Sequence, residues 1–145
     1  MTDDMNDKQP WTFWTIAVVA LLWNALGVFA FAIQPAFNPD AMQQLNAEQR
    51  ALVESTPLWA MIAYGVAVFG GLAGAIALLL RRKIAALLFG ASLLGVIVQF
   101  AHAFIFASVK VPLSGAQLVL PSIVILIAIF LYLYARKQIS KDVLK

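Results

Sequence analysis

Apolar residues gather in four long runs, and polar residues lie between the runs. A helix rises about 1.5 Å per residue, so each run is long enough to cross the roughly 30 Å hydrocarbon core of a bilayer. The runs lack the alternation with a period of two that is typical of membrane strands, and backbone groups in lipid must bond within their own segment. The pattern therefore predicts membrane-spanning helices at residues 11–33, 57–80, 84–106 and about 116–135.

The loop at residues 34–56 separates the first two runs and carries two helix-start signals. Asn38 precedes a proline, which is typical of a capping residue followed by the first helical position. Asn46 precedes a glutamine by three residues, as in a capping box. We expect short helices at about 39–45 and 47–55, whose apolar side lies on the membrane surface or folds over the mouth of the bundle. That side consists of Met42, Leu45, Leu52 and Val53.

Composition agrees with a chain dissolved in lipid. Of the 145 residues, 63% are apolar and 12% charged, whereas soluble domains average about 45–50% and about 25%. We therefore expect one membrane domain at residues 1–145. Its fold class is an all-α membrane protein, a bundle of four transmembrane helices with short amphipathic helices in the first periplasmic loop.

The basic residues predict the orientation of this bundle. Eight of the ten lie on one side of the predicted membrane: Lys8, the Arg81-Arg82-Lys83 turn, Arg136, Lys137, Lys141 and Lys145. Cytoplasmic loops are enriched in such residues, so this side is expected to be cytoplasmic and to hold both termini. The expected location is a bacterial inner membrane. The net charge of +3 is not interpreted as a nucleic-acid signal, because the basic residues flank apolar runs.

Small residues recur in the second and third runs. Helices in a membrane approach closely where side chains are small, and the short basic turn predicts an antiparallel hairpin of these two runs. The alternative is that the small faces form a dimer interface. The expected packing glycines are Gly70, Gly71, Gly74, Gly90 and Gly95.

Uncharged polar residues lie at similar depth in the half of the bundle next to the 34–56 loop. At 1.5 Å per residue, Asn24 lies roughly 13 Å deep, and Tyr64 and Gln99 roughly 10 Å. His102 shares a helix face with Gln99, and Trp23 adjoins Asn24. These five residues are the candidates for lining a ligand pocket. The alternative is structural, because amide groups commonly hold membrane helices together by interhelical hydrogen bonds.

Several kinds of chemistry have no basis in this sequence. The chain has no cysteine, which excludes disulfides and thiolate metal sites. None of the predicted spans contains an acidic residue, which argues against a proton-coupled pump. A single histidine is a poor basis for a haem or metal site, and no nucleophile–base arrangement is evident. We expect no enzyme activity, no metal and no cofactor.

Several segments resemble a group of small uncharacterised bacterial integral membrane proteins with four helices, sometimes loosely labelled sugar transporters. The resemblance covers about residues 11–100. It rests on Trp14 through Asn24, Gly27, Leu45 through Gln49, Pro57-Leu58-Trp59, Ala67 through Gly71, Leu78 through Arg81, and Ala91 through Gly95.

The sequence favours a non-enzymatic membrane protein that binds a protein partner or a lipid, for example as an accessory subunit of a larger complex. A second hypothesis is a small-solute transporter that acts as an oligomer through an uncharged polar pocket. A third is a pocket for a lipid or a quinone in the outer leaflet.

Overall fold

The computed structural model describes residues 9–106 and 115–145, and these residues form the predicted all-α architecture without any strand. Four of the helices are long and apolar enough to span a membrane. They are α1 (Trp11–Ala32), α4 (Leu58–Leu79), α5 (Ile84–Ala101) with its continuation η2 (His102–Phe106), and α6 (Gly115–Ser140). The chain is therefore a multi-pass membrane protein built as a four-helix bundle.

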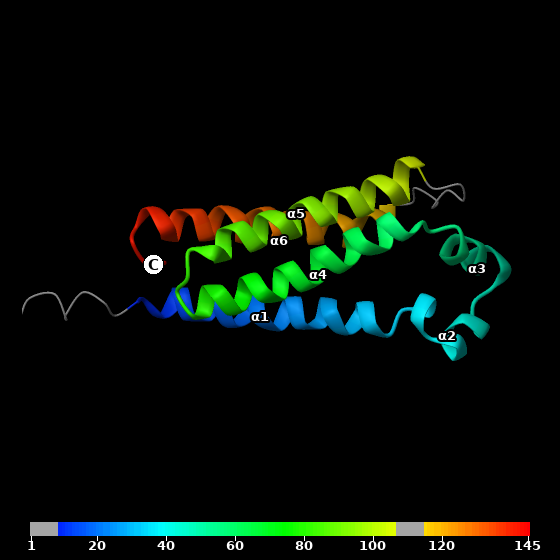
Figure 1. The fold of residues 1–145 in the computed structure, drawn as a ribbon, viewed down its shortest axis with the longest axis horizontal. Helices are drawn as coiled ribbons and strands as arrows, with labels where there is room; N and C mark the ends of the chain where they lie inside the picture. The colour runs from blue at the N-terminus through cyan, green and yellow to red at the C-terminus, as the bar shows by residue number, and fades with distance from the viewer. Residues whose placement is uncertain (1–8, 107–114) are drawn as a thin grey trace, which may run out of the picture.

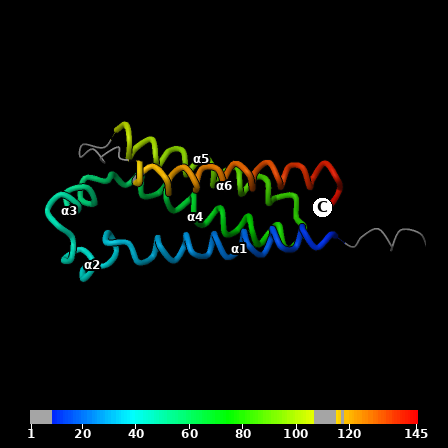
Figure 2. Tube along the Cα trace, turned by 180° about the vertical axis from the view of Figure 1, so that it is seen from behind, coloured from blue at the N-terminus to red at the C-terminus, as the bar shows by residue number. Residues whose placement is uncertain are grey.

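The long helices pack in a row, α1 on α4, α4 on α5, and α5 on α6. Figures 1 and 2 show α4 between α1 on one side and α5 and α6 on the other. We call the end with the Arg81-Arg82-Lys83 turn and the C-terminus the basic end, and the opposite end, which carries the loop helices, the loop end (Figure 1). The helices at the two ends of the row, α1 and α6, meet at the basic end, where Phe13 stacks on Tyr134 with ring centroids 6.5 Å apart.

The loop between α1 and α4 contains the short helices α2 (Pro39–Gln43) and α3 (Ala47–Glu54), preceded by the turn η1 (Pro35–Phe37). The side chain of Asn38 accepts hydrogen bonds from the first amides of α2. Asn46 and Gln49 form the reciprocal capping box at the start of α3. The predicted start signals are confirmed, and the two helices end one or two residues earlier than predicted.

Two features of the long helices differ from the prediction. First, α6 continues to Ser140, beyond the expected end near residue 135. Charged residues end the apolar run there, but arginine, lysine and glutamine are good helix formers, so the helix extends into the polar interface. Second, the span expected at 84–106 ends in a wider π-helical turn from His102 to Phe106. Such a turn is set by tertiary packing, and hydropathy carries no signal for it.

The hairpin of α4 and α5 is the most closely packed part of the bundle. At Gly95 of α5, a Cβ atom would lie 2.6 Å from the carbonyl oxygen of Ala63 and 2.8 Å from the amide nitrogen of Ala67. At Gly74 of α4, it would lie 2.8 Å from the ring of Phe89. The lack of a side chain lets the two backbones approach closely at Gly95, and makes room for the Phe89 ring at Gly74.

The other three predicted packing glycines also lie against a neighbouring helix of the same chain. Gly70 lies over the α5 backbone near Ser92, and Gly90 lies against the ring of Tyr132 in α6. Gly71 is the most enclosed, because a Cβ there would collide with the amide of Asn24 in α1 and approach the hydroxyl of Ser92. Gly71 therefore lies where three helices meet.

A compact apolar core closes the basic end. Its fully buried large side chains are Phe13, Leu78 and Leu144. Leu144 belongs to the segment after α6, which turns back so that Arg81 donates from its Nε to the carbonyl of Val143, and Lys145 donates its amide to the carbonyl of Arg81. This docking of the C-terminal segment was not predicted, because its two apolar residues stand among charged ones.

Candidate functional site

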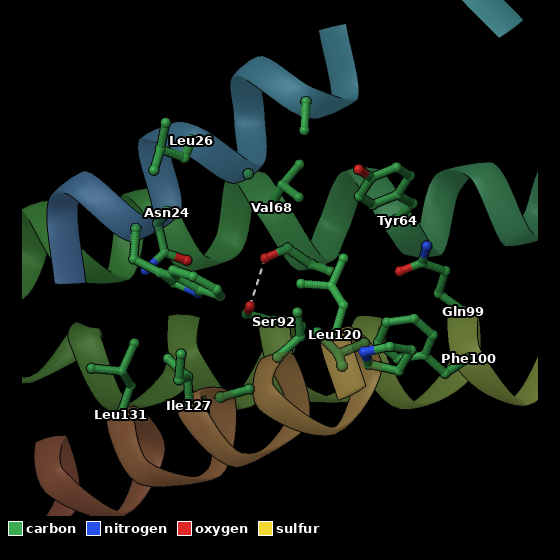
Figure 3. A pocket seen from close by; sticks show the side chains of 18 of the residues that line it. Asn24, Leu26, Tyr64, Val68, Ser92, Gln99, Phe100, Leu120, Ile127 and Leu131 are labelled. Atoms are coloured by element: carbon green, nitrogen blue, oxygen red, sulfur yellow. Dashed lines mark hydrogen bonds between the residues drawn. The ribbon is translucent and has the colours of Figure 1, made fainter. Parts of the chain in front are cut away.

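The principal cavity lies in the middle of the bundle and has a volume of about 420 Å³. All four long helices line it, and Figure 3 shows their side chains converging on it. Of the five residues expected to line a pocket, four do so: Trp23, Asn24, Tyr64 and Gln99. Ligand cavities in proteins are commonly about 300–1,000 Å³, so this cavity has room for a small molecule.

Two polar groups in the cavity are fixed by hydrogen bonds to backbone carbonyls. Asn24 donates from its Nδ2 to the carbonyl of Ala20, 2.8 Å away and one turn earlier in α1. The Asn24 carbonyl oxygen lies beside Gly71 of α4. Ser92 of α5 donates to the carbonyl of Ala67 in α4, the bond drawn as a dashed line in Figure 3. The bond of Ser92 crosses between helices, whereas that of Asn24 stays within its own helix.

The remaining polar side chains of the cavity form no hydrogen bond with other described residues. This holds for the indole of Trp23, the hydroxyl of Tyr64 and the amide of Gln99. Interhelical amide bonds, which the structural interpretation of Asn24 and Gln99 requires, do not occur within the described ranges. These groups are therefore available to a molecule in the cavity.

The polar and apolar side chains that line the cavity are distributed unevenly along the bundle axis. Tyr64 and Gln99 lie toward the loop end, and Figure 3 shows Ile127 and Leu131 at the opposite limit of the cavity. Phe89 also lines it and is buried. Asn24 lies at the level of Ile127 in Figure 3, so polar side chains line the cavity both near the loop and at mid-depth, and only its limit near Leu131 is apolar. None of the described side chains that line it is a carboxylate, an ammonium or a guanidinium.

The cavity opens at the surface between α1 and α6. Leu26 of α1 and Leu120 of α6 both line it, and they are 65% and 63% exposed. A side chain that both lines a cavity and is exposed to this degree stands at its rim. Because this surface belongs to two helices with membrane-spanning length and hydropathy, the opening faces the bilayer.

His102 lines a second, smaller cavity of about 180 Å³, which lies beneath the loop. His102 is 8% exposed, and Trp59 packs edge-on against its imidazole with ring centroids 5.0 Å apart. Leu52 of α3 also lines this cavity, so the apolar side of α3 folds over the mouth of the bundle. Tyr64 and Gln99 line both cavities and form the partition between them.

Sequence reasoning missed Ser92 and most of the contribution of α6. A serine in an apolar run was a usable signal, because its hydroxyl must find an acceptor in lipid. The α6 residues that line the cavity, such as Leu120 and Ile127, are apolar and look the same as lipid-facing ones. Only the tertiary arrangement distinguishes them.

Within residues 9–106 and 115–145, no cluster of three histidine, aspartate or glutamate side chains could hold a metal ion. Comparisons with protein-family models, with curated proteins and with solved structures found no match for this chain. The function is therefore argued from the geometry of the cavities.

Proposed function

We propose that this chain is a non-enzymatic membrane protein that binds a bilayer-dissolved amphipathic molecule, a lipid or a quinone-like compound, in the principal cavity. The observation that carries the proposal is the opening between Leu26 and Leu120, which connects a cavity with unpaired polar groups to the lipid phase. A ligand with a long apolar part reaches such a site through the bilayer without crossing water.

The polar groups of the cavity indicate the chemistry of the ligand. Tyr64 and Gln99 offer hydrogen-bond donors, and the carbonyl oxygens of Asn24 and Gln99 offer acceptors. A charged head group would lose its hydration without gaining a counter-charge, so a neutral carbonyl or hydroxyl head group fits best. The head group would lie near Tyr64 and Gln99, and the apolar part would extend toward Leu131.

The proposed setting is a bacterial inner membrane with the basic end in the cytoplasm. The concentration of lysine and arginine at that end supports this orientation. In the proposed orientation, α2 and α3 lie in the periplasm. Membership of the small bacterial membrane-protein family is part of the same proposal. A partner subunit is an alternative occupant of the exposed face between α1 and α6, as expected for an accessory protein of a complex.

Native mass spectrometry of gently extracted protein tests the proposal. We expect a retained molecule of lipid mass that is lost from Ala128→Phe, because Ala128 lines the cavity and the larger side chain fills part of it. The matched control is Ala25→Phe, which changes an exposed alanine of α1 that does not line the cavity. A wild-type protein that retains nothing, or equal retention by the two variants, contradicts the proposal. If a protein chain co-purifies with the wild type and is lost from Ala25→Phe but not from Ala128→Phe, the partner alternative is favoured.

A small-solute transporter is the second candidate, and the second cavity is the observation that favours it. The two cavities adjoin at Tyr64 and Gln99 and together extend from beneath the loop to mid-bundle. The test is swelling of proteoliposomes in small uncharged solutes such as glycerol. Asn24→Leu combined with Gln99→Leu should abolish the flux, while Ser122→Leu, a change on the exposed face of α6, should leave it unchanged. A flux that the double variant does not alter excludes this candidate.

A further inference from the structure

A third cavity, of about 310 Å³, lies at the basic end between the start of α1 and the end of α6. It shares no lining residue with the principal cavity, and it is lined by cationic and polar groups together with an apolar wall. The groups that matter here are Thr12, Phe13 and Ile16 from α1 and Lys137, Gln138 and Lys141 from the last turns of α6 and just beyond.

The charge of this cavity is positive and is not neutralised within the described part of the chain. Lys137 and Lys141 stand one helical turn apart and both line it. Neither ammonium has an ion-pair or hydrogen-bond partner in residues 9–106 and 115–145. The start of α1 adds to this positive charge, because the N-terminus of a helix carries a partial positive charge. Pro10 provides no side-chain cap, and the first turn contains no acidic residue.

Gln138 lies between the two lysines in the sequence and adds an uncharged hydrogen-bond donor to the same cavity. Its side chain lines the cavity, and the residue is only 8% exposed. Its amide forms no hydrogen bond with another described residue, although its backbone carbonyl accepts from the amide of Val143. No buried side-chain nitrogen or oxygen atom in the described part of the chain lacks a partner, so the unpaired Gln138 amide is accessible from the cavity. An oxyanion between the two lysines would accept a hydrogen bond from it.

The apolar wall relates the cavity to the surface of the membrane. Phe13 and Ile16 line the cavity, and Phe13 also belongs to the buried apolar core of the bundle. Trp11, one residue before Thr12, is 79% exposed, as expected of an aromatic residue at the membrane–water interface. The cationic groups therefore lie at the level of lipid head groups.

We propose that this cavity binds a phosphate group at the membrane surface, held by Lys137, Lys141 and the amide of Gln138. The phosphate belongs to an anionic phospholipid or to a soluble phosphate ester, and the apolar wall at Phe13 and Ile16 accommodates the attached chain of a lipid. This site is separate from the principal cavity, and the proposal does not depend on the function proposed above.

The experiment measures lipid binding to the full chain in neutral detergent by native mass spectrometry, with phosphatidylglycerol and phosphatidylcholine of identical acyl chains. A lysine near anionic lipid contributes about a fivefold change in affinity. We expect Lys137→Gln with Lys141→Gln to weaken phosphatidylglycerol binding about 25-fold. Gln138→Leu, which keeps the side-chain volume, should weaken it several-fold. A further measurement with sn-glycerol 3-phosphate identifies the source of the phosphate. An affinity comparable to that for phosphatidylglycerol indicates a soluble ester, and a much weaker affinity indicates the lipid.

The control is Arg82→Gln with Lys83→Gln, which removes the same charge from the same end of the bundle without touching the cavity. It should change the affinity less than about threefold, because the effect is then limited to screened, long-range charge. Equal binding of the two lipids, or equal loss in the two double variants, overturns the proposal. Equal thermal destabilisation of the lysine variant with and without phosphatidylglycerol also overturns it, because the lysines then stabilise the fold independently of any lipid.

Discussion

Substitution of Gly95 by alanine is the sharpest test of the α4–α5 packing. The new Cβ would lie 2.6 Å from the Ala63 carbonyl oxygen, whereas a carbon–oxygen contact needs about 3.4 Å. The obstacle is helix backbone, which cannot rotate away, so α5 must move outward by about 0.8 Å. Overpacking costs about 1–3 kcal/mol, here near the upper value, and the better helix propensity of alanine returns about 1 kcal/mol. The expected net loss of stability is about 2 kcal/mol.

Gly65→Ala is the matched control in the same hairpin. A Cβ at Gly65 would lie 3.6 Å from the ring of Phe31, an ordinary contact, so the substitution should be neutral or stabilise by up to about 1 kcal/mol. The two variants should then differ by about 2–3 kcal/mol, a roughly 30- to 150-fold difference in the folding equilibrium. Reversible unfolding in mixed micelles, followed by far-ultraviolet circular dichroism, measures it. Equal stability of the two variants would refute the close approach of α4 and α5.

Three further predictions concern the ends of the bundle. Leu144→Ala should lower the free energy of unfolding by about 2–3 kcal/mol, because Leu144 is fully buried. The control Leu133→Ala, at an exposed position, should change it little. Similar losses in the two variants would show that the C-terminal segment is undocked. Asp142→Gly should raise the melting temperature, because Asp142 has a φ of 57° that favours glycine by about 0.5–1 kcal/mol; a lower melting temperature contradicts this. Asn46→Ala should lower hydrogen-exchange protection in α3 about fivefold through loss of the capping box, with global stability unchanged; unchanged protection would show that the cap is not formed.

Much of the local structure could be predicted because its causes are local. A run of apolar residues must be a helix in lipid, whatever surrounds it. The caps at Asn38 and Asn46 depend on atoms within three residues of each asparagine. The end of α6 was missed because hydropathy reports where lipid ends, and a helix continues into water as long as its residues favour it.

The candidate site was predictable only in part. Polar residues in apolar runs stand out, so Asn24, Tyr64 and Gln99 were identified by their chemistry and estimated depth. Whether they bond to one another or face a common space depends on the rotation of each helix about its axis. The sequence contains no local signal for this rotation.

The sequence by itself determined the number of spans, their approximate positions and the absence of acidic residues within them, because the transfer of each residue into lipid depends on that residue alone. Tertiary structure decided that α1 and α6 flank the row and leave a gap between them. It also decided that the glycines of α4 and α5 face each other, and that the C-terminal segment folds back under Arg81. These features depend on contacts between residues far apart in the chain, whose free energies are shared between helices and cannot be assigned to any single position.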